Sequence, residues 1–171
     1  ARNNPRYWDN GTLKWISISD MAAYDRYTAD TSECITEYAA KNSGIKVVPK
    51  GTIIMSFKLS IGRTAITSED IYTNEAIMAF NLNEGYNLIA DYIYYYLKGH
   101  KWQGANKAVM GLTLNKASIS QNYIAIPPRE EQERIVAELD CLSGVIEKKR
   151  EQLRELDALA QSIFYQMFGD P

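Results

Sequence analysis

"IAIPPREEQERIVAELD", residues 124–140, divides the chain into two parts of different character. Two prolines end a β-like run, and Pro128 suits the first position of a helix because no hydrogen-bond donor is needed there. The chain then continues to Gly169 with one interior glycine, Gly144, and no stretch rich in β-formers. A glycine followed closely by Pro171 is a strong helix stop. The stretch therefore predicts a single helix of about 40 residues.

Apolar residues in this predicted helix recur in alternating steps of four and three. The seam comprises Ile135, Leu139, Leu142, Ile146, Lys149, Leu153, Leu156, Ala160, Ile163 and Met167. A heptad seam held over this length is typical of a coiled coil. Lys149 is its polar position. It either helps to select the register and number of partners, or lays its aliphatic stem along a loose crossing.

The predicted helix is longer than the rest of the chain is wide. At 1.5 Å per residue, Pro128 to Phe168 spans roughly 60 Å. A globular domain of this size is only about 35–40 Å across. We therefore expect the helix to project and to expose an apolar stripe, which requires a partner. The alternative is that it folds back as an ordinary amphipathic helix of the core.

Composition and cysteine usage exclude several classes of protein. Of 171 residues, 46% are apolar and 11% aromatic, which is a globular composition. No apolar run approaches the roughly 18 residues of a membrane span, and no signal-peptide pattern is visible, so no membrane partner is expected. Cys34 and Cys141 stand apart, which predicts free thiols in a cytoplasmic protein. His100 is the only histidine, which argues against a metal site.

No catalytic motif is visible in the sequence. The chain contains no P-loop, no GxGxxG turn after a strand, no HExxH and no GxSxG. The adjacent carboxylates Glu69 and Asp70 lie in a predicted turn, where solvent exposure explains them. The sequence therefore predicts a protein that is not an enzyme.

Charge differs between the two parts of the chain. Residues 1–128 carry 13 Lys and Arg against 11 Asp and Glu, a net of +2. Residues 129–171 carry 6 against 10, a net of −4. The mildly basic first part permits a polyanionic partner without requiring one.

The first 127 residues are predicted to be mostly β, with one or two helices. Alternating or β-branched runs predict strands at 13–21, 45–48 and 52–57, two more within 62–82, and a last strand at 119–127. Apolar spacing predicts a helix at 88–97, and 100–115 is expected to be a polar loop. We therefore predict an α+β fold with two domains, 1–127 and 128–171, the second being the long helix.

Three polar segments of the first part, 57–65, 72–76 and 98–111, combine cations, amides and aromatic residues. The candidate DNA contacts in them are Lys58, Ser60, Arg63, Asn74, Lys101, Gln103, Asn106 and Lys107. Arg and Lys hold phosphates or read guanine, and Asn and Gln can pair with adenine. The lysines are assigned to phosphates, Arg63, Gln103 and Asn106 to base edges, and Trp102 to packing under its loop. The plainer interpretation is a set of solvated surface loops.

The quoted stretch resembles the hallmark segment of specificity subunits of type I restriction–modification systems. In that family an Ile-Pro-x-Pro-like strand and a Glu-Gln-x-x-Ile-Val core lead into a long helix. The matching residues are Ile126, Pro127, Pro128, Glu131, Gln132, Ile135 and Val136. The segments that resemble landmarks of the family's target-recognition domain are 13–21, 48–66, 73–80 and 91–97. Residues 162–171 resemble the close of its long helix.

The resemblance implies a domain that reads double-stranded DNA and a helix that spaces and dimerises. Family members usually carry two such domains and two antiparallel helices, so this chain resembles one half, either a natural half-length protein or a fragment. It is expected to form an antiparallel homodimer. It also lacks the short segment that precedes the region of residues 3–15 in the family. Methyltransferase and restriction subunits are the implied partners. S-adenosylmethionine, ATP and Mg are expected on those subunits, and no cofactor on this chain.

Two other interpretations stay open on the sequence. One is a coiled-coil interaction protein whose globular head binds protein and no DNA. The other is a recognition domain fused, in a longer chain, to a methyltransferase or nuclease. A gel shift against duplexes with interrupted palindromes separates the first from DNA recognition, and the residues upstream decide the second.

Overall fold

A computed structural model describes residues 4–82, 84–102, 106–108 and 111–169 of the chain. The chain divides into two compact units, Ala1–Gln132 and Glu133–Pro171. We call the first unit the head and the second the distal helix, and each is described by itself. The predicted domain boundary at 127/128 stays a prediction beside this division.

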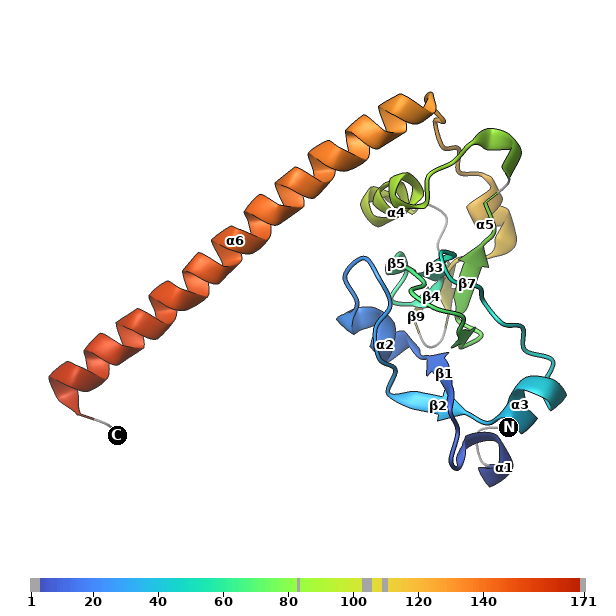
Figure 1. Cartoon of the computed structure of the whole chain (residues 1–171), viewed down its shortest axis with the longest axis horizontal. Coiled ribbons are helices and arrows are strands. Elements are labelled where there is room, and N and C mark those ends of the chain that lie inside the picture. The colour runs from blue at the N-terminus through green and yellow to red at the C-terminus, as the bar shows by residue number, and fades with distance from the viewer. Residues whose placement is uncertain (1–3, 83, 103–105, 109–110, 170–171) are drawn as a thin grey trace. The chain divides into compact units, whose positions relative to one another are not determined.

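Helix α6 runs without a break from Arg129 to Phe168, which confirms the predicted long helix (Figure 1). Its 40 residues correspond to about 60 Å at 1.5 Å per residue. Gly169 ends it with a left-handed φ of 82°, and the N–H of Gly169 donates to the carbonyl of Tyr165 at 2.9 Å. This is the glycine stop that the sequence predicts, since a residue with a Cβ is strained at that φ.

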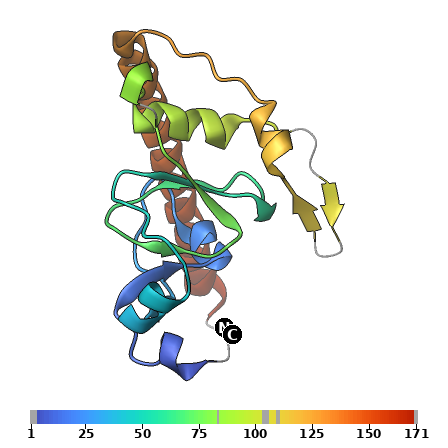
Figure 2. The same ribbon diagram turned by 90° about the vertical axis from the view of Figure 1, so that its right-hand side faces the viewer.

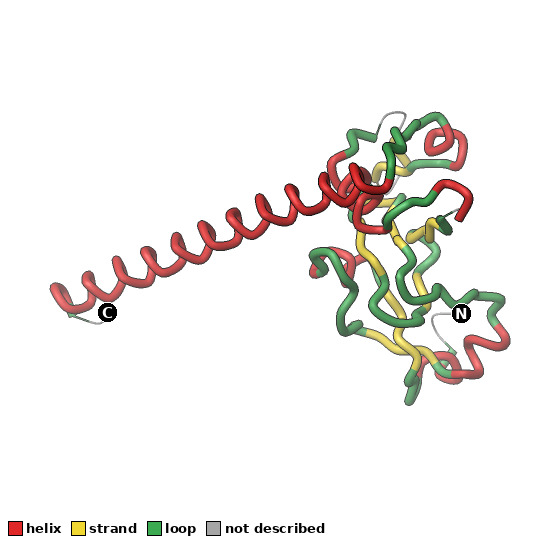
Figure 3. Tube along the Cα trace, turned by 45° about the horizontal axis from the view of Figure 1, so that its top comes forward, coloured by secondary structure: helices red, strands yellow, loops and turns green. Residues whose placement is uncertain are grey.

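The strands of the head form three small sheets (Figure 3). The first has the order β2-β1-β6, with β2 at Glu33–Ile35, β1 at Leu13–Ile16 and β6 at Tyr72–Thr73. The second has the order β5-β3-β7, with β5 at Thr64–Ile66, β3 at Ile53–Ser56 and β7 at Ile77–Phe80. The third has the order β4-β9-β8, with β4 at Lys58–Leu59, β9 at Gly111–Thr113 and β8 at Asn106–Ala108. The pair β1–β6 is parallel, and the other pairs are antiparallel.

Short helices connect these strands. They are α1 at Pro5–Trp8, α2 at Ile18–Ala23, α3 at Glu37–Asn42, the 3-10 helix η1 at Glu84–Tyr86, α4 at Ala90–Gly99 and α5 at Lys116–Ser120. Four of them begin at side chains that accept a backbone N–H, namely Asn4, Ser17, Thr36 and Asn115. These residues favour helix starts because their oxygens satisfy donors that the first turn leaves unpaired.

Strand β3 is buried on both faces and forms the centre of the head. Ile54 packs in one cluster with Ile16, Met21 and Ile71. Ile53 and Met55 belong to another cluster, with the buried residues of α4. Figure 2 shows α4 along one side of the β5-β3-β7 sheet, and its buried residues pack in the same cluster as Ile53 and Met55. Because side chains alternate along a strand, one short apolar strand supplies both clusters.

The α+β class is confirmed, and several predicted elements are wrong in detail. The strand expected at 13–21 ends at Ile16, because Ser17 and Asp20 form a capping box that starts α2. Residues 45–48 form no strand, only a single bridge from Val48 to Ile71.

Two predictions near the end of the head also fail. The loop expected at 100–115 contains β8 and β9, which pair with each other, and β9 also pairs with β4. The strand expected at 119–127 is absent: α5 ends at Ser120, and residues 121–128 form neither helix nor strand. Whether a segment becomes a strand depends on a distant pairing partner: β9 pairs with β4, whereas residues 121–128 are in no described strand pair, and local periodicity contains neither outcome.

Two other predicted properties can be compared with the described residues. Cys34 and Cys141 are both free, as predicted. Within the part of the chain that the structure describes, no helix combines the length and apolar character that membrane crossing requires.

Candidate nucleic-acid interface

The sheet β4-β9-β8 brings two of the predicted DNA-contacting segments together. Lys58 in β4 is paired with Thr113 in β9, and Thr113 is paired with Asn106 in β8. In the next row, Leu59 is paired with Leu112, and Leu112 with Lys107. Segments about 45 residues apart in the sequence are thus neighbours through one intervening strand. The predicted contact Gln103 lies outside the described residues.

Hydrogen bonds within the segment hold the turn from 56 to 63. The hydroxyl of Ser56 donates to the carbonyl of Ser60, and the N–H of Gly62 donates to the carbonyl of Ser56 at 3.0 Å. The N–H of Ser56 donates to the carbonyl of Arg63 at 2.9 Å. Ser60 therefore lies in the turn, where its backbone oxygen has a structural role.

Trp102 packs against this turn, as the sequence predicts. It belongs to the edge of the core cluster built on Ile53, Met55 and α4. A Cβ added to Gly62 would lie 3.2 Å from the Trp102 Nε1 atom. Gly62 has a φ of 86°, so a larger residue would meet both backbone strain and the indole ring. Trp102 therefore links the turn at Gly62 to the edge of this core cluster.

The sequences of this turn and of the segment that contains β8 and β9 carry cations and no acidic residue. Residues 57–65 contain Lys58 and Arg63, and residues 106–116 contain two lysines. Neither segment contains an acidic residue. The guanidinium of Arg63 is exposed and donates a long hydrogen bond, 3.4 Å, to the carbonyl of Ala22. Lys101 is also exposed. Such a patch favours a polyanion because its charges are not cancelled by neighbours along the chain.

Lys98 and His100, at the start of the third predicted segment, are engaged within the head. The ammonium of Lys98 donates to the Tyr94 hydroxyl at 2.7 Å and to Asp25 at 3.1 Å. Partial burial lowers the pKa of Lys98, but these two hydrogen bonds outweigh it and raise the pKa. The ring of His100 stacks on Tyr96, and its Nε2 lies 2.7 Å from the Asn122 Oδ1 atom. These contacts hold the start of the segment against the head.

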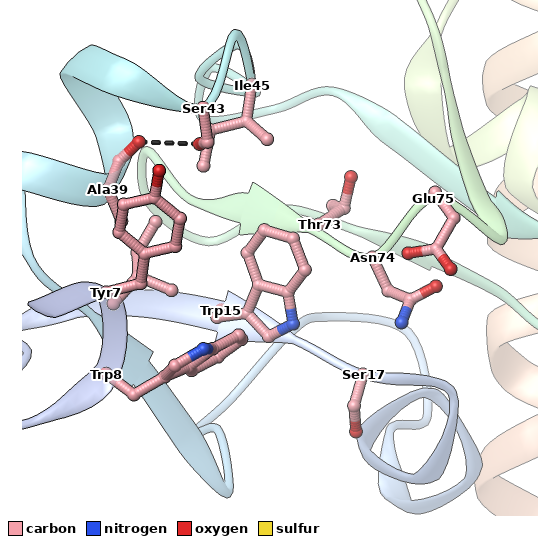
Figure 4. A pocket seen from close by; sticks show the side chains of 11 residues that line it. Tyr7, Trp8, Trp15, Ser17, Ala39, Ser43, Ile45, Thr73, Asn74 and Glu75 are labelled. Carbon is pink, nitrogen blue, oxygen red and sulfur yellow. Dashed lines mark hydrogen bonds between the residues drawn. The ribbon is translucent and has the colours of Figure 1, made fainter. Parts of the chain in front are cut away.

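Asn74 belongs to a different feature. Its side-chain oxygen accepts the N–H of Ala76 at 2.8 Å, which closes the turn between β6 and β7. It lines a pocket of about 510 Å³ together with Tyr7, Trp8, Trp15 and Glu75. Figure 4 shows Asn74 and Glu75 on one side of this pocket and Tyr7 and Trp8 on the other. The carboxylate of Glu75 makes this neighbourhood less favourable to phosphate than the β4 turn.

Gln132, in the first turn of α6, has the most completely satisfied side chain of this region. It is 1% exposed. Its amide nitrogen donates to the carbonyls of Pro127 at 2.9 Å and Asn87 at 3.3 Å. Its oxygen accepts the N–H of Ile89 at 3.0 Å. Gln132 thus fastens the start of α6 to the segment before α4, a role that was visible in the sequence only through the family motif.

The seam residues from Leu142 onward are exposed on the described chain. The sequence pattern missed five further exposed apolar or aromatic residues, Val145, Leu159, Phe164, Tyr165 and Phe168. Val145 and Leu159 each follow a seam leucine by three residues, so they widen the stripe on one side. The rings of Phe164 and Phe168 lie 5.0 Å apart and widen its C-terminal end.

Both units have counterparts among known proteins. The family model described as "Type I restriction modification DNA specificity domain" matches residues 2–157. The chain is 29% identical over 169 residues to the type I restriction enzyme MjaIX specificity subunit of Methanocaldococcus jannaschii, covering 96% of this chain and 38% of that protein. It is 30% identical over 149 residues to a type I restriction enzyme specificity subunit of Escherichia coli, with coverages of 82% and 36%.

A solved structure of a type I R-M system contains a chain of similar fold. The TM-score is 0.73 at 19% identity, covering 95% of this chain and 39% of that one. At this identity the likeness concerns the fold alone. The chain spans less than two fifths of the length of the curated relatives it matches.

Proposed function

The chain belongs to the type I restriction modification DNA specificity domain family, and from that premise we propose that it reads one half of a bipartite DNA target in a type I restriction–modification system. In this role it directs methyltransferase and restriction subunits to the target. The observation that carries the proposal is the extent of the family match, residues 2–157, which includes the head and most of α6. The proposal is made for this chain, which is shorter than its relatives.

The DNA surface that we propose is centred on the sheet β4-β9-β8. The register joins Lys58 and Asn106 in one row through Thr113, and Arg63 lies at the end of the same turn. Antiparallel strands can enter the major groove of DNA, where side chains reach base edges. In this proposal Lys58, Lys101 and Lys107 hold phosphates, while Arg63, Gln103 and Asn106 reach bases. Asn74 is retained as a candidate at a separate position beside the aromatic pocket.

The chain acts without catalysis in this proposal. Methyl transfer from S-adenosylmethionine, and cleavage driven by ATP and Mg, take place on partner subunits. The support is the family match, together with the absence from the sequence of the catalytic motifs sought above. The work of this chain is therefore recognition and placement.

We further propose that the distal helix pairs with that of a second copy in antiparallel orientation. The support is the apolar stripe, in which Leu142, Leu153 and Leu156 are each about three-fifths exposed. Apolar surface of this extent favours association because burying it is a main driving force of assembly. A two-fold pair would present two heads, each reading half of an interrupted site.

Selection from a pool of duplexes with two randomised half-sites tests the function. We expect enrichment of an interrupted two-fold site by the chain, with and without the methyltransferase subunit. No enrichment in either case would favour the interaction protein that does not bind DNA.

Variants then distinguish the two kinds of contact. Lys58→Ala should weaken binding to all sequences alike and lower the salt slope by about one. Arg63→Ala, Gln103→Ala and Asn106→Ala should each cost roughly 1–3 kcal/mol and relax preference at one base position. Lys46→Ala, at an exposed lysine outside the three sheets, is the control. If the three base-reading variants keep wild-type affinity and preference, the reading surface lies elsewhere on the head.

A further inference from the structure

Leu59 has a backbone conformation that leucine rarely adopts. Its φ is 64°, in the left-handed region. Within the described residues, the other non-glycine residues with positive φ are Asn10 and Asn87. Asparagine tolerates this region because its short side chain can bond locally, whereas a longer branched side chain is strained there. Leu59 therefore adopts a backbone conformation that its own side chain disfavours, and the rest of the fold must hold it there.

The Leu59 side chain contributes little to the stability of the fold. The residue is 53% exposed, while Phe57 and Ile61 on either side of it pack against the core. Burial of an apolar side chain stabilises in proportion to the area removed from water, so a side chain this exposed contributes little. Glycine or asparagine would permit the same turn with less strain.

The conformation at Leu59 is imposed by its surroundings. On one side, β4 is paired with β9, and on the other the hydrogen bonds of Ser56 hold the turn through Ser60 and Gly62. Trp102 covers Gly62 from the side. Strained residues persist where the surrounding structure determines them in this way, and they concentrate at functional sites.

The setting of Leu59 identifies its partner. Leu59 follows Lys58 and precedes Arg63 in the turn from 56 to 63. In the sheet, Leu59 is paired with Leu112, which is paired with Lys107. No acidic residue occurs in 57–65 or 106–116. Lys58 and Arg63, on either side of an exposed leucine in the sequence, suit a groove of DNA, where phosphates flank apolar groups, better than a neutral protein surface.

We propose that Leu59 is a specificity-determining residue that packs against the C5-methyl group of thymine in the major groove. The inference rests on the proposed function and extends it to one residue and one chemical group. The thymine methyl is the apolar feature that distinguishes base pairs in that groove. A side chain whose backbone is already held by the turn loses less entropy on contacting this methyl, which gives the strained conformation a function.

The test separates stability from recognition by means of Leu59→Gly. This variant relieves the left-handed strain, so its midpoint of urea unfolding should equal or exceed that of the wild type. Its affinity for the selected duplex should fall about tenfold, within the range of one lost base contact. Selection by the variant should lose preference for thymine at one position of each half-site. Replacing that thymine by deoxyuridine should weaken the wild type and leave Leu59→Gly unchanged. Val47→Ala, which trims an exposed apolar residue elsewhere on the head, should keep wild-type affinity.

Failure of this inference and failure of the proposed function have different signatures. If the wild type enriches no sequence, the proposed function fails and this inference with it. If the wild type selects a site and Leu59→Gly selects the same site with equal affinity, the inference alone is wrong. If Leu59→Gly keeps its DNA binding but no longer co-purifies with the methyltransferase subunit, Leu59 is a protein contact and the inference is likewise overturned.

Discussion

The head and α6 use apolar residues in opposite ways. In the head, all four residues of β3 are buried, and the strand supplies two clusters at once. In α6, forty residues contain one buried residue, the polar Gln132. The head therefore gains its stability from its own core. The distal helix has its backbone hydrogen bonds and side-chain pairs such as Arg134–Glu138 and Arg150–Glu147, which contribute only a few tenths of a kcal/mol each.

This contrast has a functional meaning under the proposed function. A recognition surface must be rigid before DNA arrives, so it belongs on a unit with its own core. A spacer needs only length and a partner. Changes in the distal helix should therefore cause loss of assembly, whereas changes in the core of the head should cause loss of folding.

The largest expected effect is on assembly. Leu139→Asp combined with Leu153→Asp places two charges in the seam of each chain, and burying a charge without a partner costs several kcal/mol. We expect dimer dissociation at least about 1,000-fold easier, with a folded head. Sedimentation equilibrium at tens of micromolar measures this.

A matched control adds the same charges outside the seam, as Ala158→Asp with Gln161→Asp. This control should remain dimeric. A wild-type chain that is monomeric at tens of micromolar would contradict the proposed pairing, because the apolar stripe of α6 would then not bind a second copy of the chain.

The next largest effect is expected at Gln132, the last residue of the head. Gln132→Ala removes three hydrogen bonds and leaves the N–H of Ile89 without its acceptor. Because an unsatisfied buried group costs about 1–3 kcal/mol, we expect unfolding of the head to be easier by about 2–3 kcal/mol. Urea denaturation followed by tryptophan fluorescence reports on the head, which contains all three tryptophans. Gln121→Ala, at an exposed position, should change the midpoint little, and an equally small change for Gln132→Ala would remove its fastening role.

A smaller effect should follow from acid. Asp20 is 8% exposed and accepts hydrogen bonds from the N–H and hydroxyl of Ser17 and from the N–H of Ser32. Burial raises the pKa of this carboxyl, but the hydrogen bonds outweigh it and hold the pKa below its ordinary value of 3.8. A depressed folded-state pKa means that the stabilisation is complete above that ordinary value and is lost as pH falls through the folded pKa.

Asp20→Asn tests this linkage. At pH 7 we expect the variant to be less stable by about 1–2 kcal/mol, because charge-assisted bonds become neutral ones. The difference from the wild type should shrink as the pH falls below about 4. Asp9→Asn, at an exposed position, is the control, and a difference that stays constant down to pH 2 would contradict the role assigned to Asp20.

The smallest effect is expected at Lys149. Its ammonium donates to the Gln152 side chain at 3.1 Å, so the structure gives it a partner within its own helix. Lys149→Leu should stabilise the dimer by about 1 kcal/mol, since an apolar seam residue gains from burial. If Lys149 selects the register, crosslinking between the two helices should show a second register in the variant. An unchanged register would reduce Lys149 to an aliphatic stem lying along the seam.

The long helix and the family were both predictable from the sequence. Helical hydrogen bonds join residues four apart, so Pro128, the heptad steps and Gly169 contain the information that makes α6. The motif around Gln132 is likewise a contiguous stretch. What the sequence did not indicate is the width of the stripe, because Val145 and Leu159 lie off the strict heptad.

The recognition surface was predictable only in composition. The cations and amides at 58–63 and 98–107 were identified as candidates, but the hairpin β8–β9 that joins the two segments was predicted to be a loop. Asn74 was grouped with them and lies instead beside the aromatic pocket. The left-handed backbone of Leu59 had no sequence signal, since leucine is not a residue that predicts it.

The physical reason is the range of the interactions. The sequence by itself determined α6, its apolar seam and the kinship of the chain, because each depends on residues a few positions apart. Only the tertiary structure decided that β4 pairs with β9, that Gln132 is buried in the first turn of α6 and that Leu59 is held in a left-handed conformation. Those outcomes depend on which distant segments meet, and strand pairing is settled by packing across the whole head.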